Sequence, residues 1–304
     1  MMGLLFTIMR FFLSFITVSG LYLISIKPRI HGRPDYRPFF GHMYAHRGLH
    51  NMNPKIQKLK NIRSGFGQQT DPESRQAEPD EKLPENSYAA IKRAADLGYG
   101  IEFDVHLTKD DIPVVFHDDT LNRICGVKGN LKDYTYEELQ QFRLLGTDER
   151  IPAFADILNM VDGRVPLIIE YKVEKNADKL CRICDSILAD YKGLYCIESF
   201  HPLAVRWYKI HRPNIVRGQL SEDFTKQKLN IPYFLLSHLI GNCYASPDFI
   251  AYNCKHKNEL SRNICRKLYK SLSIAWTVRS QEELDKVSRS FDLFIFEGFV
   301  PGRR

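Results

Sequence analysis

Short apolar segments alternate with amphipathic helical segments along most of this 304-residue chain, and this alternation restricts its fold more than any other feature. Alternation of this kind predicts parallel strands joined by helical crossovers. The predicted strands are 43–48, 101–107, 113–117, 166–172, 194–200, 216–220, 249–253, 274–278 and 293–297. The clearest helical patterns are at 87–100, 136–143, 176–190, 202–210 and 280–289.

The connection between 101–107 and 113–117 is too short for a helical crossover, because only a handful of residues around TKDD join the two strands. We therefore predict an antiparallel hairpin at this pair. Eight parallel strands then remain, the number that closes a (β/α)8 TIM barrel of the α/β class. An open doubly wound sheet is the alternative, but it would usually carry a glycine-rich turn after its first strand, and that turn is missing from this sequence.

The N-terminus is a separate apolar segment. Residues 11–26 carry no charge, and the longer stretch 4–26 is interrupted only by Arg10. As a helix this stretch would be about 34 Å long, enough to cross a bilayer. A cleaved signal peptide is the alternative, but no small-residue cleavage site follows the apolar run. We predict an uncleaved transmembrane anchor over 1–26.

Basic residues follow the anchor: Lys27, Arg29, Arg33 and Arg37. Only Arg10 and the amino terminus lie on the other side. The positive-inside rule therefore predicts a single-pass membrane protein whose C-terminal domain is cytoplasmic. We expect 27–42 to be a basic linker and 43–304 to form the barrel.

The charge and cysteine content exclude some classes of function. The 43 Lys and Arg residues exceed the 36 Asp and Glu residues only modestly and are scattered, so we expect no nucleic-acid partner. Cys181 and Cys184 lie in a helical pattern without a second pair or a nearby His, which argues against a zinc site. Residues 51–84 are polar without apolar periodicity, and we expect a disordered surface loop there.

Two predicted strands carry charged residues two positions apart. In GIEFDVHL, apolar residues alternate with Glu102 and Asp104, which places both carboxylates on one face. In PLIIEYK, Glu170 and Lys172 share a face for the same reason. Polar side chains at the carboxyl ends of barrel strands line the active site of this fold.

Three inward carboxylates are costly to bury unless a cation neutralises them. All-oxygen ligation by Glu102, Asp104 and Glu170 would suit Mg²⁺ or Ca²⁺ better than zinc. The alternative is that each carboxylate pairs with Arg47, Lys172 or another nearby base.

Histidines also fall at predicted strand ends. His46 and His117 each adjoin a charged residue there and could act as general acid and general base. Arg47 offers a planar guanidinium that fits two phosphate oxygens. His106 falls near the hairpin turn, and we interpret it as structural. A cation, an Arg, a Lys and two histidines suit phosphodiester cleavage.

These residues, in this order, resemble the glycerophosphodiester phosphodiesterases. The motifs are HRG (46–48), PENS (84–87), GIEFDVHLTKDDIPVVFHDDTLNR (100–123) and IIEYK (168–172), with weaker similarity in ESF (198–200) and AWTV (275–278). The resemblance implies a (β/α)8 barrel that hydrolyses glycerophosphodiesters to sn-glycerol 3-phosphate and an alcohol with a divalent metal.

The resemblance also implies roles for individual residues. His46 and His117 match the catalytic pair, and Arg47 and Lys172 match residues that bind the phosphate. The matched metal ligands are Glu102, Asp104 and Glu170. Glu85 and Asn86 match a pair close to the metal, and Glu85 is an additional candidate ligand. Trp276 matches an aromatic residue of the substrate pocket, although a plain core Trp fits its sequence context equally well.

The chain departs from the family pattern in three places. The stretch between His50 and Glu85 is longer than usual, the hairpin reads Asp110-Asp111 instead of Asp-Gly, and Glu297 stands near a position where many members carry Asp. Residues 118–155 correspond to the small insertion of family members, and their apolar side chains could form a hydrophobic substrate wall.

Two other functions remain open from the sequence. A lysophospholipase D-type activity on lysophospholipids would need an apolar channel beside the metal. A catalytically inactive, membrane-tethered binding barrel would be favoured by a missing catalytic residue, but each of the matched positions is filled.

Overall fold

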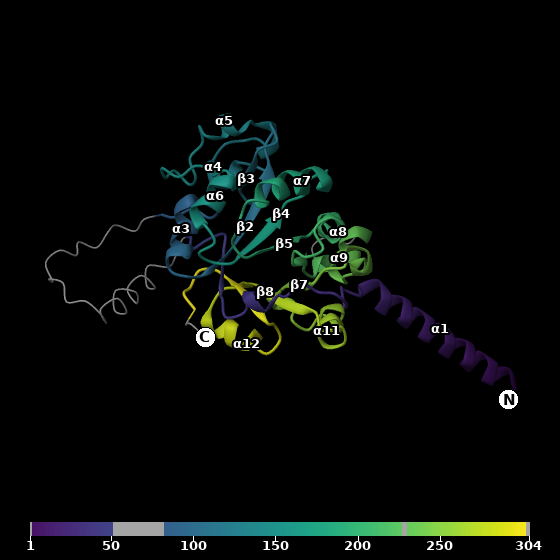
Figure 1. The fold of residues 1–304 in the computed structure, drawn as a ribbon. Helices are drawn as coiled ribbons and strands as arrows, with labels where there is room; N and C mark the ends of the chain where they lie inside the picture. Colours follow the sequence, from purple (N-terminus) through teal and green to yellow (C-terminus); the bar gives the residue numbers. More distant parts are fainter. Residues whose placement is uncertain (1, 51–81, 227–229, 302–304) are drawn as a thin grey trace, which may run out of the picture.

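The computed structural model describes residues 2–50, 82–226 and 230–301, and within them nine strands form one sheet (Figure 1). Eight strands run parallel and close into a barrel, because β1 pairs with both β2 and β9. β3 pairs antiparallel with β2, as the short connection predicted. The TIM-barrel prediction is confirmed, and the open-sheet alternative is wrong. The strands are β1 Tyr44–His46, β2 Gly100–Leu107, β3 Pro113–Val115, β4 Leu167–Tyr171, β5 Tyr195–Ser199, β6 Arg217–Ser221, β7 Phe249–Asn253, β8 Leu272–Val278 and β9 Leu293–Phe296.

Helices follow most of the strands and surround the barrel (Figure 1). Their starts are set by local capping: the Ser87 hydroxyl accepts from the amide of Ala90, and the Ser280 hydroxyl accepts from that of Glu283. The helices are α1 Met2–Ile26, α3 Tyr88–Asp96, α4 Asn122–Cys125, α5 Tyr136–Leu139, α6 Phe154–Val161, α7 Ala177–Leu188, α8 Pro202–His211, α9 Ile231–Ser237, α10 Asn242–Ala245, α11 Leu260–Lys267 and α12 Gln281–Val287.

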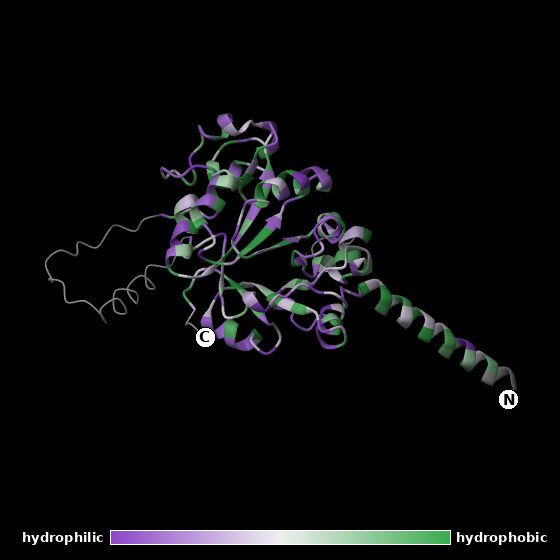
Figure 2. Ribbon diagram, viewed as in Figure 1, coloured by the Kyte–Doolittle hydropathy of each residue, from purple (hydrophilic) through white to green (hydrophobic). Residues whose placement is uncertain are grey.

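Two apolar layers hold the barrel together. One layer lies between the strands and the outer helices, and the hydropathy colouring shows its apolar strands at the centre of the body (Figure 2). The second fills the barrel interior and includes Phe39, Tyr44, Ile168 and Phe249. Gly218 makes room for the Phe249 ring, since a Cβ at this position would lie 1.9 Å from that ring.

The segment between α1 and β1 packs against the underside of the barrel, where the strands begin. The Tyr44 hydroxyl donates to the carbonyl of Phe39, which is itself buried. Arg29 Nη1 donates to the carbonyl of Pro213 at 2.7 Å and lies 3.5 Å from Asp248. Arg33 Nη2 donates to the carbonyl of Tyr269. The predicted basic linker is therefore packed on the barrel in this region.

Helix α1 projects from the body and joins it only at its last turns (Figure 1). Phe6–Ile26 is long and apolar enough to cross a membrane, and its side chains are largely exposed. A signal sequence would pass the same test. At its C-terminal end the amide of Gly241 donates to the carbonyl of Ser25, and the Tyr269 hydroxyl donates to that of Leu23.

Residues 118–155 have a small apolar core of their own. It is built on Val114 and Phe116 and contains Leu121, Ile124, Leu131, Leu139, Leu144 and Ile151. The loop expected at 51–84 falls mostly on residues 51–81, which lie outside the described residues. At its end, Leu83 is buried.

The turn after β1 depends on Gly48. This residue has φ +78°, and a Cβ there would lie 2.7 Å from the backbone of Ala90 on α3. The amide of the next residue, Leu49, donates to the carbonyl of Ala90 at 2.9 Å. Gly48 therefore lets the end of β1 approach the backbone of α3 directly.

Replacing Gly48 with Ala should destabilise the fold more than the same change at Gly41. Gly41 has φ +81°, but a Cβ added there would have no other atom within 4 Å, so Gly41→Ala meets only backbone strain of about 1–2 kcal/mol. Gly48→Ala adds an overpacking cost of about 1–3 kcal/mol. Thermal unfolding of the two variants measures the difference, and equal Tm values would contradict the close-approach argument.

Candidate active site

The barrel register brings four carboxylates together at the mouth. Asp104 on β2 pairs in register with Glu170 on β4, and Glu170 pairs with Glu198 on β5. Glu102, on the same face of β2 as Asp104, is in register with His46 on β1. All four carboxylates are buried, with Glu170 the most exposed at 6%. Glu198 was not among the predicted site residues.

Two cations neutralise part of this cluster. Lys172 Nζ lies 2.9 Å from Asp104 Oδ1 and 2.6 Å from Glu170 Oε1. Arg47 Nε lies 3.4 Å from Asp104 Oδ2, and the Arg47 backbone amide donates to Glu102 Oε2 at 3.2 Å. One oxygen each of Glu102, Asp104 and Glu170 lies within 4.8 Å of the others.

The pKa values of the carboxylates in this cluster shift in opposite directions. Burial and then repulsion from Asp104 and Glu198 raise the pKa of Glu102 well above its ordinary value. Burial also raises the pKa of Glu198, whose Oε2 has no hydrogen-bond partner among the described residues. Burial opposes ionisation of Asp104 too, but Lys172 and Arg47 outweigh it and lower its pKa. Four carboxylates with two cations leave uncompensated charge when all are ionised.

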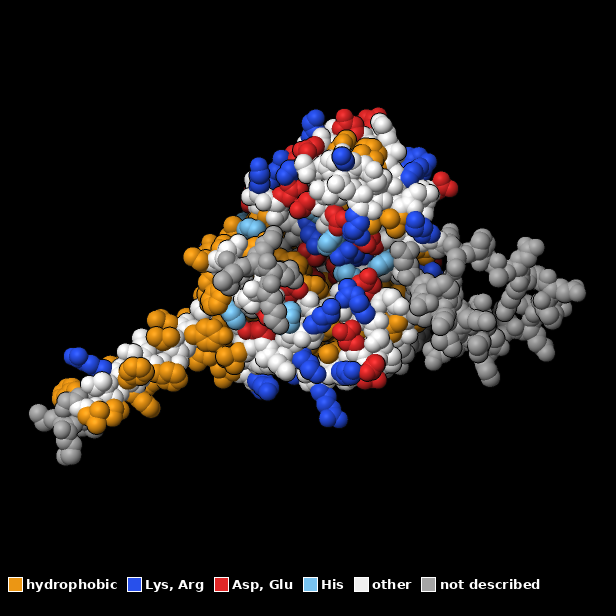
Figure 3. Space-filling view, turned by 180° about the vertical axis from the view of Figure 1, so that it is seen from behind, with side chains coloured by type: hydrophobic (Ala, Val, Ile, Leu, Met, Phe, Trp, Pro, Cys, Tyr) orange, Lys and Arg blue, Asp and Glu red, His pale blue; other side chains and the backbone are white. Residues whose placement is uncertain are grey.

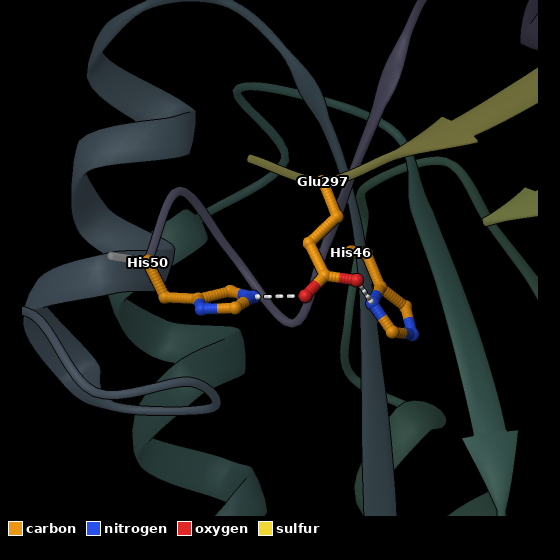
Figure 4. Close-up of side chains that lie close together, drawn as sticks. All are labelled: His46, His50 and Glu297. Atoms are coloured by element: carbon orange, nitrogen blue, oxygen red, sulfur yellow. Dashed lines mark hydrogen bonds and ion pairs between the residues drawn. The ribbon is translucent and has the colours of Figure 1, made fainter. Parts of the chain in front are cut away.

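Glu297 directly follows the last strand, β9, and contacts the imidazole of His46. His46 Nδ1 lies 3.3 Å from Glu297 Oε2, and His50 Nε2 lies 3.9 Å from Glu297 Oε1 (Figure 4). Figure 4 shows the two imidazoles on opposite sides of this carboxylate. Burial lowers the pKa of His46 to about 4, although Glu297 opposes that shift. The hydrogen bond from His46 lowers the pKa of Glu297 to about 2.

His117 lies at the end of the β3 hairpin arm and is about one third exposed. Its Nδ1 lies 2.6 Å from Asp118 Oδ1, which leaves Nε2 for another partner. His106 Nε2 lies 3.1 Å from the backbone carbonyl of His117, so His106 contacts the hairpin arm that carries His117.

A second network ties the insertion to the β1 turn. Glu85 accepts from Arg47 Nη1 at 2.6 Å and from Arg123 Nη1 at 2.8 Å. Burial opposes the ionisation of Glu85, but the hydrogen bonds from Arg123 and the charge of Arg47 lower its pKa to about 2. Asn86 Nδ2 donates to Asp104 Oδ2 at 2.8 Å. Arg123 was not predicted as a site residue, although it is the last residue of the motif 100–123.

A pocket of about 570 Å³ is lined by both proposed catalytic histidines, His46 and His117, and by three of the four buried carboxylates. Figure 3 shows acidic, basic and histidine side chains gathered around a hollow in one face of the molecule. Trp276 lies on the wall, with its ring 5.6 Å from that of Phe200 in an edge-to-face arrangement. The predicted residues that line the pocket are His46, Arg47, Glu102, His117, Glu170, Lys172 and Trp276. Asp104 lies behind the wall and pairs with Lys172.

The residues present fit a hard divalent cation. The donors are carboxylate oxygens from adjacent strands, and burial holds the pKa of two of them, Glu102 and Glu170, above the ordinary value. A cation with oxygen preference would offset that cost. Glu85 belongs to a different group, with His117 and Asp118.

Comparison with known proteins identifies similar chains. The model of the glycerophosphoryl diester phosphodiesterase family matches residues 46–289. A glycerophosphodiester phosphodiesterase of Caldanaerobacter subterraneus is 40% identical over 150 residues, which cover 45% of this chain and 61% of that protein. One of Bacillus altitudinis is 38% identical over 157 residues, covering 47% and 64%. The match thus spans less than two thirds of the length of these two relatives.

Solved structures share the fold. A phosphodiesterase of Oleispira antarctica, in complex with the product sn-glycerol-3-phosphate, has a TM-score of 0.63 at 20% identity over 86% of this chain and 94% of its own. A glycerophosphodiester phosphodiesterase of Thermotoga maritima has a TM-score of 0.57 at 20% identity, covering 84% and 93%. The family model spans most of the barrel, from His46 at the end of β1 to Arg289 before β9. The chain belongs to the glycerophosphoryl diester phosphodiesterase family.

Proposed function

We propose that this chain hydrolyses glycerophosphodiesters to sn-glycerol 3-phosphate and an alcohol with the help of a divalent cation. The observation that carries the proposal is that one pocket contains two histidines, two basic side chains and a group of buried carboxylates. Phosphodiester hydrolysis needs charge neutralisation at phosphate and proton transfer at the ester oxygens, and this set provides both.

Glu102, Asp104 and Glu170 are the proposed ligands for Mg²⁺ or Ca²⁺. When bound, such a cation would neutralise phosphate charge and make the phosphorus atom more electrophilic. Arg47 and Lys172 add positive charge beside the same carboxylates and would bind phosphate oxygens. Glu85 holds the Arg47 guanidinium in place.

His46 and His117 are the proposed acid and base. His46 has its Nδ1 against Glu297, so Nε2 is the nitrogen that faces the carboxylates, at 3.9 Å from Glu102 Oε2. His117 has its Nδ1 against Asp118 in the same way. A carboxylate on Nδ1 orients an imidazole and sets its tautomer, which prepares Nε2 for proton transfer. Trp276 is the proposed aromatic wall for the substrate.

We also propose that α1 anchors the protein in a membrane with the barrel on the cytoplasmic side. The charge bias around the helix supports this orientation. The carbonyls of Ser25 and Ile26 accept hydrogen bonds from Gly241 and Asn242, so cleavage inside the helix would remove contacts that the barrel uses. This supports an uncleaved anchor over a removed signal peptide.

Divalent cation should stabilise and activate the protein. We expect Mg²⁺ or Ca²⁺ at about 100 times its Kd to raise the free energy of unfolding by about 2.7 kcal/mol. Glu102→Gln and Glu170→Gln should remove that rise, while the exposed Glu137→Gln should keep it.

In the activity assay, chelator should abolish glycerol 3-phosphate release from glycerophosphocholine, and His46→Ala should lower kcat by about 10²–10⁴-fold.

Stabilisation by metal without product release under any tested cation would favour the inactive binding barrel. Activity that is unchanged by chelator or by His46→Ala would contradict the proposed mechanism.

Glu297→Gln should lower kcat by about tenfold or more, because His46 loses the carboxylate that orients it. It should also change acid stability. Folding lowers the pKa of Glu297 from 4.5 to about 2, so its ionised form stabilises the fold fully above pH 4.5 and this contribution is lost as pH falls towards 2. Between about pH 5 and about pH 3 the Tm of the variant should therefore fall less than that of the native protein. Parallel Tm curves would argue against a lowered pKa of Glu297 in the folded protein.

The orientation of the anchor can be tested with C-terminal fusions in a bacterial host. We expect a fluorescent protein fused after Arg304 to be fluorescent and alkaline phosphatase at the same point to be inactive. Arg29 and Arg33 bond to the barrel, so Lys27→Gln with Arg37→Gln changes the charge bias with less risk to the fold. That double variant should weaken the orientation, and an active phosphatase fusion on the native chain would overturn the assignment.

A further inference from the structure

A second pocket, of about 530 Å³, adjoins the catalytic pocket. The two pockets share lining residues, including Glu170 and Lys172 on the polar side and Phe200, Tyr233 and Leu236 on the apolar side. Much of its remaining wall is apolar and comes from α9 and the turn after it: Pro232, Leu235, Leu239 and Ile240. A cavity of this size, apolar and open to a charged site, is typical of a ligand pocket.

Three polar residues on its wall, Gln219, Ser199 and Asn242, bond to backbone carbonyls of the protein. Gln219 Nε2 donates to the backbone carbonyls of Ser199 and Leu220. The Ser199 hydroxyl donates to the carbonyl of Tyr171, and Asn242 Nδ2 donates to that of Ile26. These donors are directed to the backbone. The Asp, Glu and Lys side chains of the lining, Asp119, Glu170 and Lys172, are all shared with the catalytic pocket, so they lie at that end.

The far end of the pocket lies beside the last turn of α1. Gly241 and Asn242 line the pocket and also bond to the carbonyls of Ser25 and Ile26, at 3.1 Å and 3.3 Å. The last turn of α1 therefore contacts the flank of the barrel directly, with no linker between them. If α1 lies in a bilayer, the apolar end of the pocket is next to the membrane surface.

The outer face of α9 is apolar as well. Ile231 is 75% exposed and Phe234 is 45% exposed, and Leu235 is exposed while it also lines the pocket. Hydrophobic side chains gather where α1 meets the body in Figure 3. A helix with exposed apolar residues beside a membrane anchor suits contact with lipid.

We infer that the second pocket binds one acyl chain of a monoacyl glycerophosphodiester that enters from the bilayer. The inference rests on the proposed function and names its substrate class. The phosphate lies at the charged end and the chain along α9, which matches the polarity of an amphiphile with a single chain. Water adds across the bond between phosphorus and the head-group oxygen: its oxygen joins phosphorus and its proton leaves on the alcohol, so lysophosphatidylcholine yields lysophosphatidic acid and choline.

The test uses the full chain in nanodiscs of phosphatidylethanolamine and phosphatidylglycerol, with choline release as the readout. The substrates are glycerophosphocholine and lysophosphatidylcholines with hexanoyl or palmitoyl chains. Ile240→Trp shortens the pocket at its far end, and Leu235→Trp narrows it from α9. Ile112→Trp, at the β2–β3 turn and outside both pockets, is the matched control. The ratio of variant to native kcat/KM cancels the different partitioning of the substrates into the bilayer.

We expect either pocket variant to lower kcat/KM for the palmitoyl substrate by about tenfold or more. The same variants should leave the values for hexanoyl substrate and for glycerophosphocholine within about twofold, and Ile112→Trp should leave all three within that range. Tm values check that the variants fold. If one pocket variant is unfolded, the other decides.

If the ratio of variant to native kcat/KM is the same for the palmitoyl and hexanoyl substrates in folded variants, the acyl-chain pocket is overturned. The proposed function would then stay intact. Native protein that releases choline from glycerophosphocholine but not from palmitoyl lysophosphatidylcholine would also overturn the acyl-chain pocket and leave the proposed function intact. Failure of the proposed function looks different, because no choline would then be released from any of the substrates.

Discussion

Lys172 pairs with Asp104 and Glu170, and these ion pairs offset part of the repulsion among the buried carboxylates at the barrel mouth. Parallel register places carboxylates from β2, β4 and β5 side by side in a buried layer, where they repel one another. Removing one partner from such a buried network leaves uncompensated charge. Lys172 and Arg47 supply part of the compensation, and the raised pKa values of Glu102 and Glu198 mark where it is incomplete. That deficit is the physical basis for the proposed cation.

The turn after β1 connects this cluster to the outside of the barrel. Arg47 has φ +53°, which turns its backbone amide toward Glu102 and its guanidinium toward Asp104 and Glu85. Gly48 permits the chain to continue directly against α3. Glu85 then receives Arg123 from the insertion. A continuous set of ion pairs therefore runs from the barrel interior to the segment 118–155, and it holds both histidine loops relative to the carboxylates.

The underside and one flank of the barrel are shaped by the N-terminal segment. Phe39 packs into the lower end of the barrel, and Arg29 and Arg33 bond to carbonyls of the barrel underside and flank. The last turn of α1 bonds to Gly241 and Asn242, which also line the apolar pocket. The last turn of the helix and the pocket thus share a wall, so the proposed membrane anchor would set which flank of the barrel faces the bilayer.

The sequence by itself determined the element types, the number of parallel strands, the hairpin and the apolar N-terminal helix. These follow from short-range facts, namely the period of apolar residues and the length of a connection. It also placed Glu102, Asp104, Glu170 and Lys172 on inward faces, because alternation along one strand decides which way a side chain points.

Only the tertiary structure decided which distant residues meet. Glu198 joins the carboxylates through the register of β5, and Glu297 reaches His46 because β9 closes the barrel onto β1. Arg123 meets Glu85 only once the insertion has folded over the mouth. Arg29 reads in sequence as part of a charge bias, yet it bonds to Pro213. Such contacts depend on strand register and loop packing between segments far apart in the chain, and local periodicity carries no information about either.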